Sequence, residues 1–147
     1  MSRILVAIDF SPCSQAAIQA AVQLALDLKA PLRLVHAFPE HLKRPAVALV
    51  GFEELFEEIA SQTESQEAIQ LTSVWAQTAR DEGLDVDVAA RPVRADVLLL
   101  EEAAKPDAAL IVMGRSGKGA IRKALVGSVT HEVVKRSPKP VLVVPEA

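Results

Sequence analysis

The stretch that decides the fold is Met113-Gly-Arg-Ser-Gly-Lys-Gly-Ala-Ile-Arg-Lys-Ala-Leu-Val-Gly-Ser-Val129. An apolar run over 108–112 precedes it, and a segment with apolar residues at helical spacing follows it. The stretch therefore connects a buried strand to a helix. It holds four of the six glycines of the chain, Gly114, Gly117, Gly119 and Gly127. A glycine-rich turn from a strand into a helix is typical of an α/β protein that binds its ligand at that turn.

The chemistry that this stretch favours is the binding of a phosphate chain by backbone amides. Glycine lets a ligand come close to the backbone N–H groups, because it has no Cβ. A helix that begins near Gly127 adds unpaired N–H donors and the positive end of its dipole. Arg115, Lys118, Arg122 and Lys123 add positive charge. The alternative interpretation is a surface loop in which the glycines only make turns and the basic side chains are solvated.

Two well-known phosphate-binding loops are excluded by the spacing. A Walker A loop needs Gly-Lys followed by Ser or Thr, whereas Gly117-Lys118 is followed by Gly119. The dinucleotide-binding fingerprint needs a third glycine at the position where this chain has Arg122. The loop belongs to neither class.

Length, charge and cysteine content limit the kind of protein. With 147 residues, half of them apolar, the chain is expected to form a single domain over 1–147. A net charge of −3 gives no basis for binding nucleic acid or an anionic membrane. The single cysteine, Cys13, suits a reducing compartment, and no apolar run is long enough to span a bilayer. We therefore predict a cytoplasmic protein.

Apolar patterning and breaker residues predict alternating strands and helices. Strands are expected over 4–8, 32–38, 84–88, 108–112 and 141–144, and helices over 12–29, 52–82, 97–104 and 127–136. Ser11 and Pro12 suit the N-cap and the first position of the first helix. A polar interval over 61–67 leaves open whether the helix over 52–82 is continuous, and 39–51 is expected to be irregular.

This alternation predicts an α/β fold, an open parallel five-stranded sheet with helices on both faces. The first and fourth strands are the most apolar, and the strand over 84–88 alternates apolar and acidic residues, as expected of an edge strand with one wet face. The strand order 3-2-1-4-5 satisfies both observations. Ligands bind beyond the carboxyl ends of the strands at the topological switch, which here lies between Asp9 and Gly114.

The last strand is then an apolar edge, made of Val141, Leu142, Val143 and Val144. An apolar edge strand invites pairing with another chain. We predict a homodimer that is joined through this strand.

The glycine spacing also carries a family resemblance. Gly114-Arg115-Ser116-Gly117, nine further residues and then Gly127-Ser128 match the signature G-x2-G-x9-G-[S/T] of the ATP-binding branch of the universal stress protein family. The segments 4–11 and 140–145 are also similar to that family. The resemblance covers essentially the whole chain. It implies the strand order 3-2-1-4-5 and dimers that usually form through the last strand.

The resemblance also implies roles for individual residues. Ala7, Ile8 and Asp9 would border adenine and ribose, Ala37 would pack on adenine, and Met113 and Gly114 would line the ribose side. The phosphates would be held by Gly117, Gly127, Ser128 and Val129, with Arg115 and Lys118 nearby. One departure from the family is the junction over 91–94, where the family often has a glycine and this chain has Arg-Pro-Val-Arg.

No catalytic or metal-ligating set is recognisable. His36, His41 and His131 show no metal-ligand spacing with one another or with Cys13, and no Ser-His-Asp or Cys-His signature is present. We therefore assign neither catalytic residues nor protein ligands for a metal. The leading hypothesis is a dimeric regulator or sensor in stress response that binds ATP (or ADP or AMP), with Mg²⁺ or Mn²⁺ as a possible companion, and hydrolyses it little or not at all. The alternatives are a slow ATPase or autokinase, and a nucleotide-free scaffold.

Overall fold

Five parallel strands form one sheet in the computed structural model, which describes residues 2–38, 52–116 and 126–146, without the side chains of 52–65. The sheet order is β3-β2-β1-β4-β5. The elements are β1 (Arg3–Ala7), α1 (Pro12–Leu28), β2 (Leu32–Ala37), α2 (Phe52–Asp81), β3 (Val86–Arg91), α3 (Ala95–Ala103), β4 (Ala108–Gly114), α4 (Ser128–Arg136) and β5 (Val141–Val144). The predicted fold class and strand order are confirmed.

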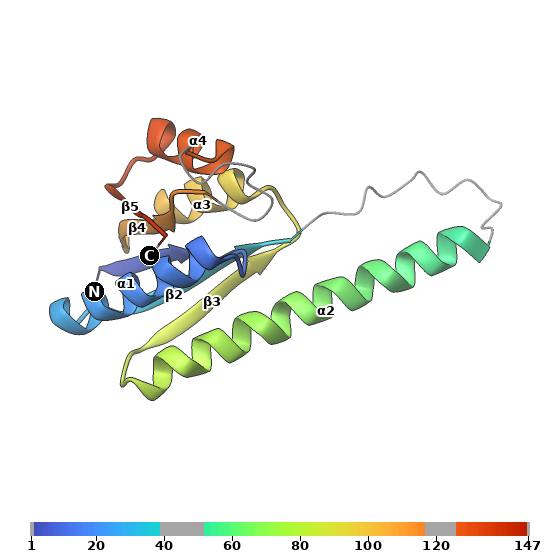
Figure 1. Ribbon diagram of the computed structural model, residues 1–147, viewed down its shortest axis with the longest axis horizontal. Coiled ribbons are helices and arrows are strands. Elements are labelled where there is room, and N and C mark those ends of the chain that lie inside the picture. Colours follow the sequence, from blue (N-terminus) through green and yellow to red (C-terminus); the bar gives the residue numbers. More distant parts are fainter. Residues whose placement is uncertain (1, 39–51, 117–125, 147) are drawn as a thin grey trace.

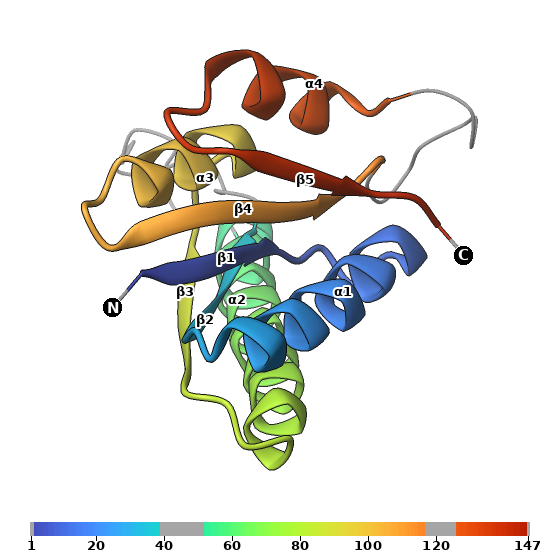
Figure 2. The same ribbon diagram turned by 90° about the vertical axis from the view of Figure 1, so that its left-hand side faces the viewer.

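Helices cover both faces of the sheet (Figures 1 and 2). Because successive residues of a strand point to opposite faces, β1 contributes to two hydrophobic clusters. Ile4 and Val6 belong to the cluster beneath α1 and α2, and Leu5 belongs to the cluster beneath α3 and α4. All three side chains are essentially inaccessible to solvent. The near-continuous apolar run at the start of the chain therefore produces a central strand that is buried on both faces.

Helix α2 is continuous, which answers the question that the sequence left open. It runs for 30 residues, and its amino-terminal part extends beyond the sheet (Figure 1). Its carboxyl-terminal part packs on the sheet through Ala76 and Ala79, which belong to the cluster beneath α1 and α2. Within the described ranges, no helix combines the length and the apolar character that crossing a bilayer requires.

The edge strand β3 differs from its prediction in its bounds, which are 86–91 rather than 84–88, and in the exposure of one side chain. The Asp87 side chain stays 44% exposed, but it is ion-paired, because the parallel register places it beside Arg33 of β2. The Arg33 guanidinium donates from Nε and Nη2 to the two carboxylate oxygens of Asp87, at 2.8 and 2.9 Å. The predicted alternation holds at Val86, which is buried, and at Asp85, which is exposed. It fails at Val88, which was expected to point inward and is exposed.

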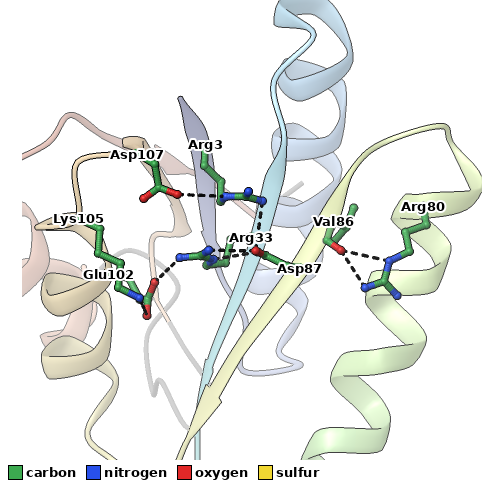
Figure 3. A network of polar contacts seen from close by, with 8 residues as sticks. All are labelled: Arg3, Arg33, Arg80, Val86, Asp87, Glu102, Lys105 and Asp107. Atoms are coloured by element: carbon green, nitrogen blue, oxygen red, sulfur yellow. Dashed lines mark hydrogen bonds and ion pairs between the residues drawn. The ribbon is translucent and has the colours of Figure 1, made fainter. Parts of the chain in front are cut away.

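Asp87 and Arg33 belong to an ion-pair network at the amino-terminal end of the sheet (Figure 3). Arg33 also donates to Glu102 of α3 at 2.8 Å, and Glu102 accepts from Lys105 at 2.8 Å. Arg3 lies 3.3 Å from Asp87 and 3.6 Å from Asp107. The network ties three neighbouring strands to α3, at the end of the sheet away from the predicted ligand site.

Candidate functional site

A cavity of about 290 Å³ lies at the carboxyl ends of β1 and β4, where the strand order reverses direction. Its volume is close to the lower end of the range for small-molecule sites, about 300–1,000 Å³. The lining brings together the ends of two strands and the first turns of α1, α3 and α4. The described residues that line it are Ala7, Ile8, Asp9, Ser14, Ala95, Leu99, Met113, Gly114, Ser116, Gly127, Ser128, Val129 and Thr130.

Most of the predicted contact residues meet in this cavity. Those that line it are Ala7, Ile8, Asp9, Met113, Gly114, Gly127, Ser128 and Val129. Gly117 and Lys118 lie outside the described residues. Ala37 packs against the cluster beneath α3 and α4, one strand away from β1, and is not part of the lining. Arg115 is also absent from the lining, although it follows β4 directly.

Three helices direct their amino ends at the cavity, and they differ in how these ends are capped. In α1, the hydroxyl of Ser11 accepts a hydrogen bond from the Ser14 N–H at 3.2 Å. In α3, the acidic side chain of Asp96 already lies in the first turn. The first turn of α4 has neither a side-chain cap nor an acidic residue. Among these three helices, α4 is therefore the one whose positive end is left for an anion.

The first turn of α4 offers its N–H groups to the cavity. Among the described residues, no hydrogen bond uses the N–H of Ser128, Val129 or Thr130. These are the donors that a helix leaves unpaired at its amino end. Gly127 is different, because its N–H already donates to the Arg115 carbonyl at 2.9 Å. Gly127 can therefore contribute close approach to a ligand, but its N–H is engaged within the chain.

The turn after β1 places Asp9 in the lining. The Asp9 carboxylate accepts a hydrogen bond from the Ser11 N–H at 2.9 Å, so the residue shapes the turn and also faces the cavity. Phe10 adopts the left-handed backbone conformation, with φ of 64°. Its ring packs on His36 and Trp75, with centroids 4.7 and 5.2 Å away. This packing offsets a conformation that is costly for an aromatic residue.

His36 supports the same turn from β2. Its Nδ1 lies 2.6 Å from the Ile8 carbonyl oxygen, which can only accept, so Nδ1 carries the proton and donates. The imidazole is buried in this position. This is a structural role. Within the described part of the chain, no group of three or more His, Cys, Asp and Glu side chains could hold a metal ion.

Five further residues line the cavity. Ser14, Ala95, Leu99, Ser116 and Thr130 line the cavity and were not predicted. Those that lie on helices could have been expected from the fold class, since the first turns of helices face the carboxyl edge of a parallel sheet. The predicted start of α3 at Val97 lay two residues too late to include Ala95. The junction over 91–94 needs no glycine, because Val93 donates to the Arg91 carbonyl at 3.0 Å with no left-handed residue there.

Comparison with known proteins agrees with this geometry. The model of the universal stress protein family matches residues 1–145. The chain belongs to the universal stress protein family. Universal stress protein YxiE of Bacillus subtilis is 29% identical over 97% of this chain and 98% of the relative.

Solved structures share the universal stress protein fold. Hypothetical protein MJ0577 superposes with a TM-score of 0.80 at 26% identity, over 97% of this chain and 94% of that chain. A universal stress protein in complex with cAMP gives a TM-score of 0.68 at 23% identity, over 99% and 98% of the two chains. The Archaeoglobus fulgidus universal stress protein in complex with dAMP gives 0.65 at 23% identity, over 98% of both chains. At these identities, the two complexes support the fold of this chain.

Proposed function

We propose that this universal stress protein binds an adenine nucleotide, with ATP as the first candidate, in the cavity at the carboxyl ends of β1 and β4. The observation that carries the proposal is the uncapped first turn of α4, which faces this cavity and suits an anion. The Asp9 carboxylate, which also lines the cavity, suits a hydroxyl or an amine of the ligand. In this proposal the protein is a nucleotide-dependent regulator or sensor in stress response, with little or no hydrolysis. Its cytoplasmic location stays a prediction from the sequence.

Three further observations support an adenine nucleotide. Two proteins that share this fold were solved in complex with cAMP and with dAMP. Both ligands combine an adenine base with a phosphate. The apolar part of the lining, which includes Ala7, Leu99 and Met113, suits a base or a sugar edge. The glycine spacing that begins at Gly114 resembles the signature of the ATP-binding branch of the family. We expect Mg²⁺ or Mn²⁺, where required, to enter with the phosphates.

The proposal is tested most sharply by Ser128→Pro. Ser128 is the first residue of α4, where proline is compatible with a helix, and Gly127 has the extended backbone (φ −66°, ψ 158°) that a residue before proline prefers. The substitution therefore removes one N–H donor and one hydroxyl while the helix start is kept. We expect the affinity for ATP, measured by calorimetry, to fall by about tenfold or more, since hydrogen bonds to charged groups contribute roughly 1.5–3 kcal/mol.

Ser128→Ala is the matched control for the amide. It removes the hydroxyl and keeps the N–H, so it should weaken ATP binding less than Ser128→Pro does. The thermal unfolding of both variants should stay close to that of the wild type. Equal ATP affinity in the wild type and in folded Ser128→Pro would contradict the proposed amide site, and no ATP binding by the wild type would contradict the proposed function.

We further propose that the protein acts as a homodimer joined through β5. Pro140 and Val144 accept hydrogen bonds from Ile111 and Arg115 of the β4 side, so the backbone groups of Val141 and Val143 point to the open edge. Leu142 is 42% exposed on this strand. The strand thus combines an apolar character with a row of backbone groups that no neighbouring strand in the sheet uses.

Val143→Pro should convert the dimer to a monomer. Proline removes an outward N–H and blocks edge pairing, while the bonds of β5 to β4 are kept. Light scattering at micromolar concentration should give twice the chain mass for the wild type and the chain mass for the variant. The matched control is Val88→Pro on β3, the opposite edge, which should stay dimeric. A monomeric wild type would contradict the prediction.

A further inference from the structure

We propose that Thr130 is a positioning residue for the phosphate site, which holds the first turn of α4 against the end of β4. This inference rests on the proposed function and goes beyond it, because it assigns a role to a residue outside the glycine signature. Thr130 is the third residue of α4 and is 3% exposed. Its hydroxyl donates to the Gly114 carbonyl at 2.9 Å.

The acceptor of this hydrogen bond lies outside the helix that carries the threonine. Such hydroxyls often bond to a carbonyl one turn earlier in the same helix. Thr72 and Thr78 of α2 do so, to Ala68 at 2.7 Å and to Val74 at 3.0 Å. Thr130 instead bonds to a strand residue that lies 16 positions earlier. Its hydroxyl therefore links two elements, whereas those of Thr72 and Thr78 stay within one helix.

A second bond joins the same two elements. The Gly127 N–H donates to the Arg115 carbonyl at 2.9 Å, and the Arg115 N–H donates to Val144 of β5 at 3.2 Å. The amino end of α4 is thus attached at two points, Gly127 and Thr130, to a segment that is itself paired with β5. The donors of Ser128 and Val129 lie between these two points.

This arrangement makes the donor positions depend on the Thr130 hydroxyl. A helix end that has no side-chain cap is prone to fray, because nothing local orders its first turn. Here Gly127 provides no cap, so the order must come from the sheet. Backbone donors held in place before a ligand binds cost less ordering entropy on binding. Loss of the hydroxyl should therefore weaken binding of the phosphates, but not of the nucleoside.

The experiment compares Thr130→Val with Thr130→Ser and Thr72→Val. Valine matches threonine in shape but lacks the hydroxyl, and serine restores it. ATP and adenosine are titrated into each protein by calorimetry. For Thr130→Val we expect ATP affinity to fall about tenfold and adenosine affinity to change less than about twofold, the size of effect that one lost hydrogen bond produces. Thr130→Ser should recover most of the ATP affinity.

Thr72→Val is the control for the loss of a buried hydroxyl. Thr72 is fully buried and bonds a helix carbonyl, but it does not line the cavity. This variant should bind ATP as the wild type does, even where its thermal stability is lower.

A readout in the nucleotide-free protein separates positioning from direct contact. The His131 N–H donates to the Gly127 carbonyl at 2.9 Å, the first hydrogen bond within α4. Fraying of the first turn should speed the hydrogen exchange of this amide in Thr130→Val, relative to both wild type and Thr72→Val. If Thr130→Val fails to fold, Thr130→Ala and Thr130→Ser provide the same comparison.

The outcomes separate this inference from the proposed function. Unchanged ATP affinity in Thr130→Val, equal losses for ATP and adenosine, or unchanged exchange at His131 would each overturn the inference. If Ser128→Pro weakens ATP binding while Thr130→Val does not, the proposed function stands and the role of Thr130 falls. If the wild type binds neither ATP nor adenosine, both are overturned.

Discussion

Gly114→Ala is expected to destabilise the protein by about 3 kcal/mol or more and to abolish nucleotide binding. A Cβ at this position would lie 2.7 Å from the Cys13 Cβ and 2.9 Å from the carbonyl carbon and oxygen of Cys13. The obstacle is largely the backbone of α1, which cannot turn away as a flexible side chain can. The end of β4 or the start of α1 would have to move, and both border the cavity.

This result would revise the role of the first glycine in the signature. The sequence favoured close approach to a ligand as the reason for Gly114, whereas the structure shows close approach to a neighbouring helix. Urea unfolding of the variant measures the loss of stability. The matched control is Gly83→Ala, where the new Cβ meets nothing within 4 Å and only a left-handed φ of +92° opposes the change. That strain costs about 1–2 kcal/mol, so a Gly83→Ala loss equal to or above that of Gly114→Ala would contradict the prediction.

Arg33→Met is expected to lower the free energy of unfolding by roughly 1.5–3 kcal/mol, because it removes a charge-assisted hydrogen bond from the buried Glu102 carboxylate, which keeps only Lys105 as a cationic partner. The Glu102 side chain is 5% exposed and that of Arg33 is 16% exposed, so solvent compensates little for the lost ion pair. Asp87, at 44% exposure, contributes less, because water reaches its carboxylate. Urea unfolding at neutral pH measures the loss.

The double variant Arg33→Met/Glu102→Leu is the control for this prediction. When both buried charges are replaced by apolar groups, much of the stability should return, as replaced buried ion pairs often show. If the double variant is less stable than Arg33→Met, the loss of stability does not come from the Glu102 charge that is left without Arg33, and the prediction is contradicted.

The single variant Arg33→Met should also change how the free energy of unfolding depends on pH. The hydrogen bond from Arg33 lowers the pKa of Asp87 in the folded protein. A carboxyl with a lowered folded pKa stabilises the fold above its unfolded pKa of about 3.9, and this contribution is lost as the pH falls through the folded value. The wild type should therefore lose stability on acidification below about pH 4 more steeply than Arg33→Met, in which the pKa of Asp87 returns toward its ordinary value. Identical acid limbs would show that Arg33 does not perturb this carboxyl.

The sequence by itself determined the features that depend on neighbouring residues along the chain. Ser11 and Pro12 predicted the start of α1, and Ser11 is its cap with Pro12 as the first helical residue. The apolar run at 141–144 predicted β5 with its observed bounds. The apolar content of β1 and β4 predicted their central positions, and the alternation at 84–88 predicted the edge position of β3. Local propensity and periodicity carry this information, because they act over a few residues.

Only the tertiary structure decided the features that depend on partners far apart in sequence. Asp87 is ion-paired because the register sets it beside Arg33, 54 positions earlier. Phe10 holds a left-handed backbone because His36 and Trp75 provide packing partners. Thr130 is tied to β4 because its hydroxyl bonds to Gly114, 16 positions earlier. The energy of each contact comes from a pairing that exists only once the sheet and its helices have assembled, so no local pattern could have signalled it.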